Sequence, residues 1–454
     1  MQFKALAAAA AAIPLSSFAH VGDDTAALRS QLQQLRQEYE ARLKALEQRL
    51  DAAEKAQQAA AAAPPPAPVP SPAPARPATP ALALSAVLTG TYANLRNDPE
   101  TYRIQGFIPG GEELGPGRRS FSLGESELTL AANVDPYFLG RLTFALTPEG
   151  EAEVEEAYVR TTALAHGVSI AGGRFLSGIG YLNPQHAHAW DFVDAPLAYQ
   201  AFFGGQHKTD GVQLKWIAPT ETYVELAAEL GNGDAFPGSE RNRNGAGSAM
   251  VAAHAGGDWG TSASWRAGAS LLHTKADGRA YEDEDSAGAS VVYAFSGRSR
   301  TAVLDAVYKW VPSRSTSFKL QGEYVWRRET GALDYDVEGA SLGRSSDRYR
   351  SRQSGWYLQG VYQFAALWRA GLRYDRLKSG TPSIGLVDSG VLSASDFPRL
   401  ASFEPRRTTA MVDYSLTEFS RLRLQLADDR AQPGRSDRQL FVQYIMSLGA
   451  HGAH

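Results

Sequence analysis

Apolar and polar residues alternate with a period of two along most of the chain, from Leu82 to Gly449. Segments of about ten residues carry apolar side chains on one face and polar or charged side chains on the other, as β-strands do. In residues 421–426, three leucines alternate with Arg421, Arg423 and Gln425. The pattern predicts an all-β body over residues 82–454, and a soluble β-sandwich is the alternative for any single strand.

Short and long connections between these segments also alternate. Outer-membrane barrels have this arrangement, with short periplasmic turns and longer external loops. One strand on each side of every connection predicts a transmembrane antiparallel up-and-down β-barrel of about 16 strands. Ser290–Ser296 is assigned to an external loop, because a strand there would make the strand number odd. Tight turns are predicted at residues 135–136, 165–167, 218–220, 256–258, 312–314, 365–367 and 417–418, and long loops at 96–118, 176–208, 232–246, 275–300, 329–352 and 380–404.

Aromatic residues gather near the ends of the predicted strands, where girdles at the two membrane interfaces are expected. A barrel of this size leaves a water-filled lumen. The aromatic residues in question are Tyr92, Tyr137, Trp216, Trp310, Trp326, Trp356, Trp368, Tyr414 and Tyr444.

Three further segments precede the barrel. Residues 1–19 combine Lys4, an apolar stretch and Ser17-Phe18-Ala19, a pattern typical of a signal peptide. Residues 23–58 carry leucines at steps of three and four, which predicts a coiled-coil helix; a helix lying on the membrane is the alternative. Residues 59–80 are rich in Ala and Pro and are expected to form an extended linker.

Composition narrows the class of protein. The chain has no Cys, which excludes disulfides, iron–sulfur clusters and thiol nucleophiles. Its 45 basic and 49 acidic residues give a net charge of −4, so nucleic acid is not an expected partner. The sequence has no nucleophile-elbow motif and no phosphate-binding loop, and we therefore expect no enzyme activity.

Three stretches resemble a group of proteobacterial outer-membrane proteins related to the phosphate-selective O/P porins and often labelled zinc-regulated outer-membrane receptors. They are Gly172–Gly205, Trp356–Leu377 and Tyr444–His454. The coiled coil and Pro-rich linker before a barrel are similar to those of the trimeric dicarboxylate porins. The resemblance implies a porin-like fold and a homotrimer. A TonB-dependent receptor does not fit, because the segment before the first strand reads as helix and linker rather than as a plug domain.

Charged residues on the polar strand faces are expected to line the lumen. The arginines of the closing strands form a basic stripe, and glutamates gather in the first half of the barrel. A fixed arginine stripe predicts a slight anion preference. The predicted pore-lining residues are Arg141, Lys215, Glu225, Glu229, Arg369, Arg373, Arg421 and Arg423.

The predicted loop at residues 176–207 is too apolar to be a solvated tip, so we expect it to fold inward as the constriction. His186 and His188 are candidate zinc ligands, with Asp191 and Asp194 close behind them; packing of the loop is the alternative role. His451 and His454 form a second pair beyond the last strand. The predicted constriction residues are Tyr181, His186, His188, Trp190, Asp191 and Asp194.

These features together predict a porin in the outer membrane of a Gram-negative bacterium. It would contact outer-membrane lipid, pass small hydrophilic solutes or ions by diffusion, and form a homotrimer through a periplasmic coiled coil. No cofactor is expected apart from the zinc considered above. Two other functions remain as alternatives: a zinc-related receptor or uptake channel, and a structural tether of the outer membrane.

Overall fold

The computed structural model describes residues 44, 82–110, 114–147 and 150–449, and the barrel unit, Thr79–His454, is considered by itself. The predicted signal peptide, the linker and all of the predicted coiled coil except Lys44 lie outside the described residues, as do His451 and His454. Those assignments stay predictions.

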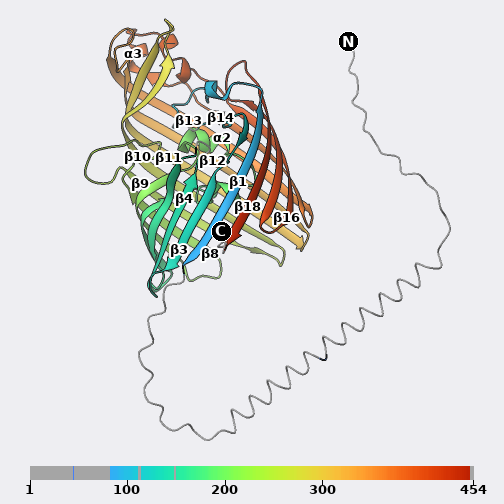
Figure 1. Ribbon diagram of the computed structural model, residues 1–454. Helices are drawn as coiled ribbons and strands as arrows, with labels where there is room; N and C mark the ends of the chain where they lie inside the picture. The colour runs from blue at the N-terminus through green and yellow to red at the C-terminus, as the bar shows by residue number, and fades with distance from the viewer. Residues whose placement is uncertain (1–43, 45–81, 111–113, 148–149, 450–454) are drawn as a thin grey trace, which may run out of the picture. The chain divides into compact units, whose positions relative to one another are not determined.

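The barrel unit is a single closed antiparallel sheet (Figure 1). Sixteen strands build the wall, and the first and last pair with each other, with Val87 opposite Ser447. The predicted fold class is therefore confirmed. The strands are β1 (Ala83–Leu95), β3 (Ser126–Asn133), β4 (Phe138–Leu146), β5 (Ala152–Thr161), β6 (Val168–Leu176), β7 (Lys208–Ile217), β8 (Tyr223–Gly231), β9 (Ser248–Trp259), β10 (Ala263–Glu284), β11 (Ser290–Ser313), β12 (Thr316–Tyr335), β13 (Ser345–Ala365), β14 (Trp368–Lys378), β16 (Arg406–Thr417), β17 (Ser420–Arg430) and β18 (Asp437–Gly449).

Smaller elements lie in the connections at one end of the barrel and inside it. Among the described residues, no helix is long and apolar enough to cross a membrane. These elements are β2 (Ser120–Ser122), β15 (Ser383–Ile384), the α-helices α2 (Leu197–Phe203) and α3 (Gly385–Asp388), and the 3-10 helices η1 (Pro99–Thr101), η2 (Ala187–Ala189), η3 (Ala394–Asp396) and η4 (Pro398–Leu400).

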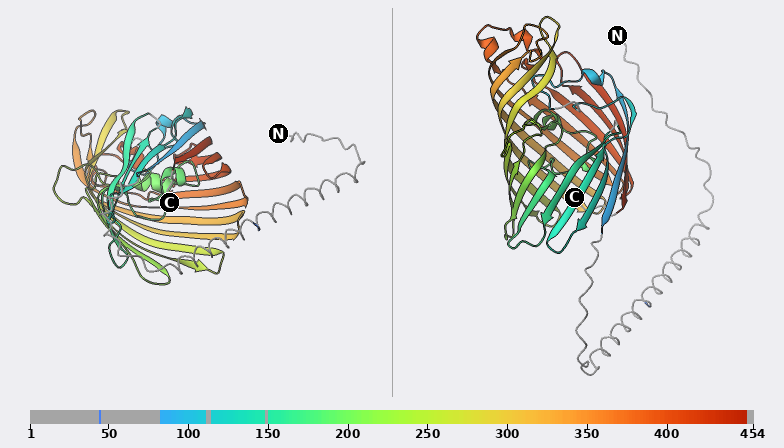
Figure 2. Two further views of the ribbon diagram at one scale, coloured as in Figure 1. Left: turned by 60° about the horizontal axis from the view of Figure 1, so that its bottom comes forward. Right: turned by 60° about the vertical axis from the view of Figure 1, so that its left-hand side comes forward.

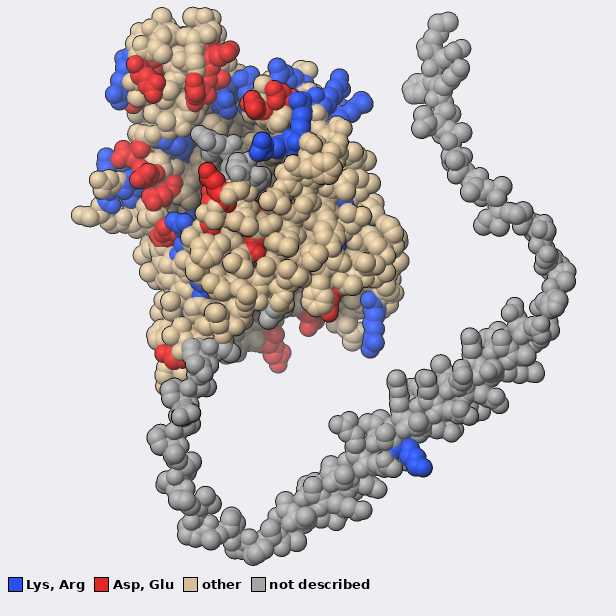
Figure 3. All heavy atoms as spheres, in the orientation of Figure 1, with Lys and Arg blue, Asp and Glu red and all other residues tan. Residues whose placement is uncertain are grey.

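The two faces of each strand meet different surroundings. Leu424 on β17 is 46% exposed on the outside of the barrel, whereas its neighbour Arg423 is 1% exposed and points inward. An apolar outer face and a polar interior are the arrangement of a transmembrane barrel, and a soluble sandwich would have the reverse. On the face seen in Figure 3, charged side chains gather mainly toward the long-loop end, and the wall around β1 and β18 is mostly uncharged.

Aromatic side chains mark two levels on the outer surface. Tyr137 and Trp368 lie near the short turns and are 63% and 42% exposed. Trp326 lies on the same strand as Phe318, eight positions further from the turn. Eight residues of a strand tilted by about 40° span roughly 20 Å across the membrane, close to the apolar height of such barrels. The aromatic levels therefore bracket the apolar band.

Four neighbouring strands, β10–β13, are about twice as long as the others and form a raised wall at the long-loop end (Figures 1 and 2). Three predictions are wrong here. Ser290–Ser296 belongs to β11 rather than to a loop, the predicted loop at residues 275–300 is only residues 285–289, and the predicted loop at residues 329–352 is only residues 336–344. The strand number stays even because β10 and β11 simply continue beyond the membrane. The turn predicted at residues 256–258 also lies slightly later, after β9 ends at Trp259.

Candidate functional site

The connection between β6 and β7, residues 177–207, runs inside the barrel; we call it the inner loop. It contains η2 and α2, and Figure 2 shows α2 within the ring of strands. Every residue of α2 is buried, and Leu197, Tyr199 and Phe202 have no measurable exposure. This burial explains why the loop is rich in aromatic residues, the feature from which inward packing was predicted.

Glycines let the inner loop approach its neighbours closely. Gly204 ends α2 with a positive φ of 68°, and a Cβ there would lie 2.6 Å from the carbonyl oxygen of Gly110. Gly180 also has a positive φ, and a Cβ there would lie 2.2 Å from the Glu323 carboxylate. A side chain at either position would combine backbone strain with a clash.

Glu323 of β12 attaches the inner loop to the wall. One of its oxygens accepts hydrogen bonds from the backbone N–H of Leu182 at 2.9 Å and from the Tyr357 hydroxyl at 2.7 Å. The other accepts from the Tyr199 hydroxyl at 2.8 Å. Three donors from two parts of the loop and a neighbouring strand therefore meet on one buried carboxylate.

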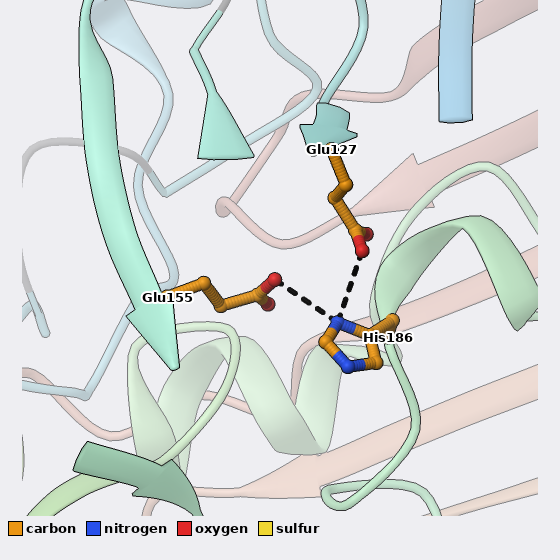
Figure 4. A group of neighbouring side chains, drawn as sticks. All are labelled: Glu127, Glu155 and His186. Atoms are coloured by element: carbon orange, nitrogen blue, oxygen red, sulfur yellow. Dashed lines mark hydrogen bonds and ion pairs between the residues drawn. The ribbon is translucent and has the colours of Figure 1, made fainter. Parts of the chain in front are cut away.

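His186 and His188 of the inner loop face an acidic wall formed by β3 and β5, and Figure 4 shows His186 beside Glu127 and Glu155. His186 Nδ1 lies 3.1 Å from Glu127 and 3.0 Å from Glu155, and Nε2 lies 3.2 Å from Glu156. His188 Nδ1 lies 2.7 Å from the second oxygen of Glu127. A β-bulge explains why two consecutive glutamates face inward, because Thr143 pairs with Glu156 while Phe144 pairs with Val154.

The aspartates of the inner loop face the opposite, basic wall. Asp191 pairs with Lys319 and, at 3.2 Å, with Arg369. Asp194 pairs with Arg373 at 2.8 Å and with Arg407 at 2.7 Å. The loop thus carries histidines toward the glutamates and carboxylates toward the arginines, so its charges complement both walls.

The surroundings of the inner loop change the pKa values of its ionisable side chains. Burial opposes charge on His186, but hydrogen bonds to Glu127, Glu155 and Glu156 raise its pKa well above the ordinary value. Burial likewise opposes charge on Asp194, yet Arg407 and Arg373 hold its pKa below the ordinary value. Burial lowers the pKa of His207, at the end of the loop, to about 4. The loop is therefore positively charged toward one wall and negatively charged toward the other.

The predicted pore-lining residues all lie on the inner face of the barrel, but several are covered by the inner loop. Arg373 and Arg423 are almost fully buried, and Arg423 pairs with Asp413 at 2.8 Å. Glu229 accepts from Ser177 and from the backbone N–H of Gly178. The expectation of a solvated arginine stripe is therefore wrong for these two arginines, because the loop packs over them.

Other predicted residues remain partly exposed. Arg421 donates to the carbonyl oxygen of His188 at 2.6 Å, and Arg141 lies 3.6 Å from Glu156. Glu225 pairs with His254 at 3.2 Å. Tyr181 lies under the guanidinium of Arg266, 5.4 Å from ring centre to charge.

Sequence reasoning grouped His186 and His188 with Asp191 and Asp194, and the structure separates them onto opposite walls. The sequence analysis also did not identify several residues that contact the inner loop or its partners. The alternation of apolar and polar residues places all of them except Glu155 on the inner face, but their partners depend on how the loop crosses the barrel. The missed residues are Glu155, Arg407 and Asp429.

Partly exposed basic side chains line the barrel below the inner loop, near the short-turn ends of the strands. This region, which we call the basic vestibule, also contains the partly exposed Glu225. Its basic residues are Arg141, Arg160, Lys215, Arg266, Lys309, Lys319, Arg369 and Arg421.

Comparison with known proteins places the chain among its relatives. No family model matches it. An "Uncharacterized protein" of Aquifex aeolicus (strain VF5) is 30% identical over 367 residues, which cover 76% of this chain and 72% of the Aquifex protein. The chain belongs to the family of this Aquifex protein.

The chain is also similar to solved structures, at low sequence identity. The trimer form of OmpT of Vibrio cholerae is 10% identical, covers 82% of this chain and 100% of that chain, and has a TM-score of 0.49. The outer membrane channel DcaP of Acinetobacter baumannii is 12% identical, with coverage of 81% and 97% and a TM-score of 0.47. An anion-selective porin from Comamonas acidovorans is 11% identical, with coverage of 82% and 100% and a TM-score of 0.46.

Proposed function

We propose that the protein is an outer-membrane porin that passes small hydrophilic solutes by diffusion, with the inner loop as its constriction. The observation that carries the proposal is the inner loop itself, which lies inside a closed transmembrane barrel and is attached to both charged walls.

The opposed walls suggest how the constriction acts. Charged side chains on both sides of the inner loop make the interior polar, and a polar interior favours hydrated solutes over apolar ones. The ion pairs of the inner loop keep its backbone in place while solutes pass beside it. This function is diffusive and involves no catalysis.

Planar-bilayer recording tests the proposal directly. Because the chain has no Cys, a thiol reagent can react only with a cysteine introduced by mutation. We expect stepwise conductance from the purified full-length protein. In the variant Lys309→Cys, a bulky thiol reagent should lower that conductance, because Lys309 lies in the basic vestibule. Arg314→Cys, in an exposed short turn, is the matched control and should be insensitive.

Liposome swelling extends the test to uncharged solutes. Liposomes containing the protein should swell in small sugars and not in large ones. A barrel that neither conducts ions nor admits sugars would overturn the porin function and favour the structural tether.

A further inference from the structure

The cluster of His186, Glu127 and Glu155 has the composition of a metal site. Each residue offers one ligand atom, and these atoms all lie within 4.8 Å of one another. The ring nitrogen of His186 is 3.0 to 3.1 Å from the two carboxylates. Two ligands on a tetrahedral zinc ion at about 2.0 Å are roughly 3.3 Å apart, so the side chains need only small shifts to share one ion.

A second observation points to cation binding at this cluster. The side chain of Glu155 is completely buried, and its oxygen Oε1 has no hydrogen-bond partner. A buried carboxylate oxygen without a donor is costly. The bulge in β5 brings Glu155 inward, and Figure 4 shows its carboxylate pointing toward His186. A cation bound there through Oε1 would satisfy this oxygen.

We propose that Glu127, Glu155 and His186 bind a divalent transition-metal cation of the zinc class. A mixed set of imidazole and carboxylate ligands suits such ions better than calcium or magnesium. His188 contacts the other oxygen of Glu127 and would orient it, as an outer-shell residue does. The ion would join β3 and β5 to the inner loop.

The test uses the full-length protein in detergent, stripped with a chelator and titrated with Zn²⁺ under equilibrium dialysis. We expect one tightly bound Zn²⁺ that excess Ca²⁺ does not displace. Glu155→Gln and His186→Gln should each weaken this binding by at least about tenfold. Glu225→Gln is the control, because Glu225 holds a different buried histidine, and it should bind Zn²⁺ like the unchanged protein.

Two further measurements keep the test decisive. Replacing His451 and His454 together should leave the tight site intact, which separates it from the second histidine pair. X-ray absorption of the unchanged protein should give one imidazole with oxygen ligands, even if a variant fails to fold. Weak binding, or binding that both ligand variants retain in folded barrels, would overturn the metal site. Neither result depends on conduction, so the porin function is tested separately.

A second inference rests on the outer surface of the raised wall. A strip of exposed basic side chains lies just beyond the aromatic level of Trp326, and none of them forms an ion pair within the described part of the chain. Arg300 lies opposite Arg328, and Arg328 lies opposite Arg352 on the next strand. Like charges directly opposite each other destabilise a sheet. We call this strip the outer basic strip: Lys275, Arg298, Arg300, Arg328, Arg348, Arg350 and Arg352.

We infer that the outer basic strip binds the phosphate groups of lipopolysaccharide in the outer leaflet. The position supports this occupant, because headgroups lie immediately beyond the interfacial aromatics. A multiply phosphorylated headgroup can contact several of these side chains at once and relieve their repulsion.

Titration of the detergent-solubilised full-length protein with purified lipopolysaccharide tests this site. The triple variant Arg300→Gln, Arg328→Gln and Arg352→Gln should bind at least about tenfold more weakly. Without lipid it should be as heat-stable as the unchanged barrel. Lys215→Gln, Arg266→Gln and Lys309→Gln together remove the same charge from the lumen and should not alter lipid binding.

Two competition experiments distinguish lipopolysaccharide from other sources of phosphate. Inorganic phosphate and phosphatidylglycerol should compete poorly. Equal binding of lipopolysaccharide by both triple variants, or equal competition by inorganic phosphate, would overturn this inference.

Discussion

Glu323 shows how much of the interior depends on one side chain. Its carboxylate is buried and accepts hydrogen bonds from Leu182, Tyr199 and Tyr357. Removing an acceptor leaves buried donors unpaired, and each unpaired donor costs about 1–3 kcal/mol. The attachment of α2 to the wall should therefore be sensitive to a change at this position.

We predict that Glu323→Leu releases the inner loop while the barrel stays closed. Chymotrypsin is a suitable probe, because the loop contains aromatic residues and neither Lys nor Arg. The variant should be cut within residues 177–207 in conditions where the unchanged protein is protected. Glu338→Leu, at an exposed position, is the control. Equal protection of both variants would show that the remaining contacts suffice to hold the loop.

Single residues were only partly predictable. The composition of the inner loop pointed to inward packing, and the alternation on β17 placed Arg423 inside. Neither could show that Arg423 pairs with Asp413, because that contact depends on strand register. Glu155 was out of reach, since a bulge reverses the inside and outside positions of its strand.

At the scale of elements, the membrane-spanning parts of the strands were predictable and the raised wall was not. Alternation of apolar and polar residues identifies a strand only where its outer face meets lipid. Beyond Trp326 the outer face of β12 and β13 meets water, so Arg328 and Arg350 replace the apolar residues and the segment reads as a polar loop. The inner face remains aromatic there, with Tyr335 and Tyr349 buried.

The inner loop gives the prediction that belongs to this scale. Replacing residues 184–199 by a short Gly-Ser linker should raise single-channel conductance, because the segment occupies the interior of the barrel. Deleting residues 242–246, an exposed tip of the β8–β9 connection, is the control and should leave conductance unchanged. A loop deletion with unaltered conductance in a folded barrel would place the constriction elsewhere.

At the scale of the whole molecule, the predicted coiled coil should determine the oligomeric state. Its leucine seam needs a partner, and a linker separates it from the barrel in the sequence. Deleting residues 23–58 should weaken or abolish trimers on a native gel while the barrel remains folded. Leu35→Asp with Leu46→Asp should act in the same direction, since each buries an unpaired charge. Trimers that survive both changes would show that contacts between barrels are enough.

The distribution of charge over the whole barrel determines the expected ion preference. The inner loop largely neutralises both walls, as the pairs of Arg373 and Arg407 with Asp194 illustrate, and aspartates on the basic wall pair with its other arginines. The basic vestibule is different, because its lysines and arginines are partly exposed to the lumen. Fixed, accessible positive charge attracts anions. We therefore still expect the slight anion preference that the sequence predicts, but we attribute it to the basic vestibule rather than to the buried arginines Arg373 and Arg423.

We predict that the reversal potential in a salt gradient reports this preference and that the vestibule carries it. Lys215→Gln, Arg266→Gln and Lys309→Gln together should shift the reversal potential toward cations, because they remove three positive charges from the lumen. The triple variant of the outer basic strip at Arg300, Arg328 and Arg352 changes the net charge equally but lies outside the barrel, so it should leave the potential unaltered. Equal shifts in both variants would show that total charge matters rather than its position. No shift in the variant at Lys215, Arg266 and Lys309 would transfer the preference to other basic residues of the lumen, such as Arg421.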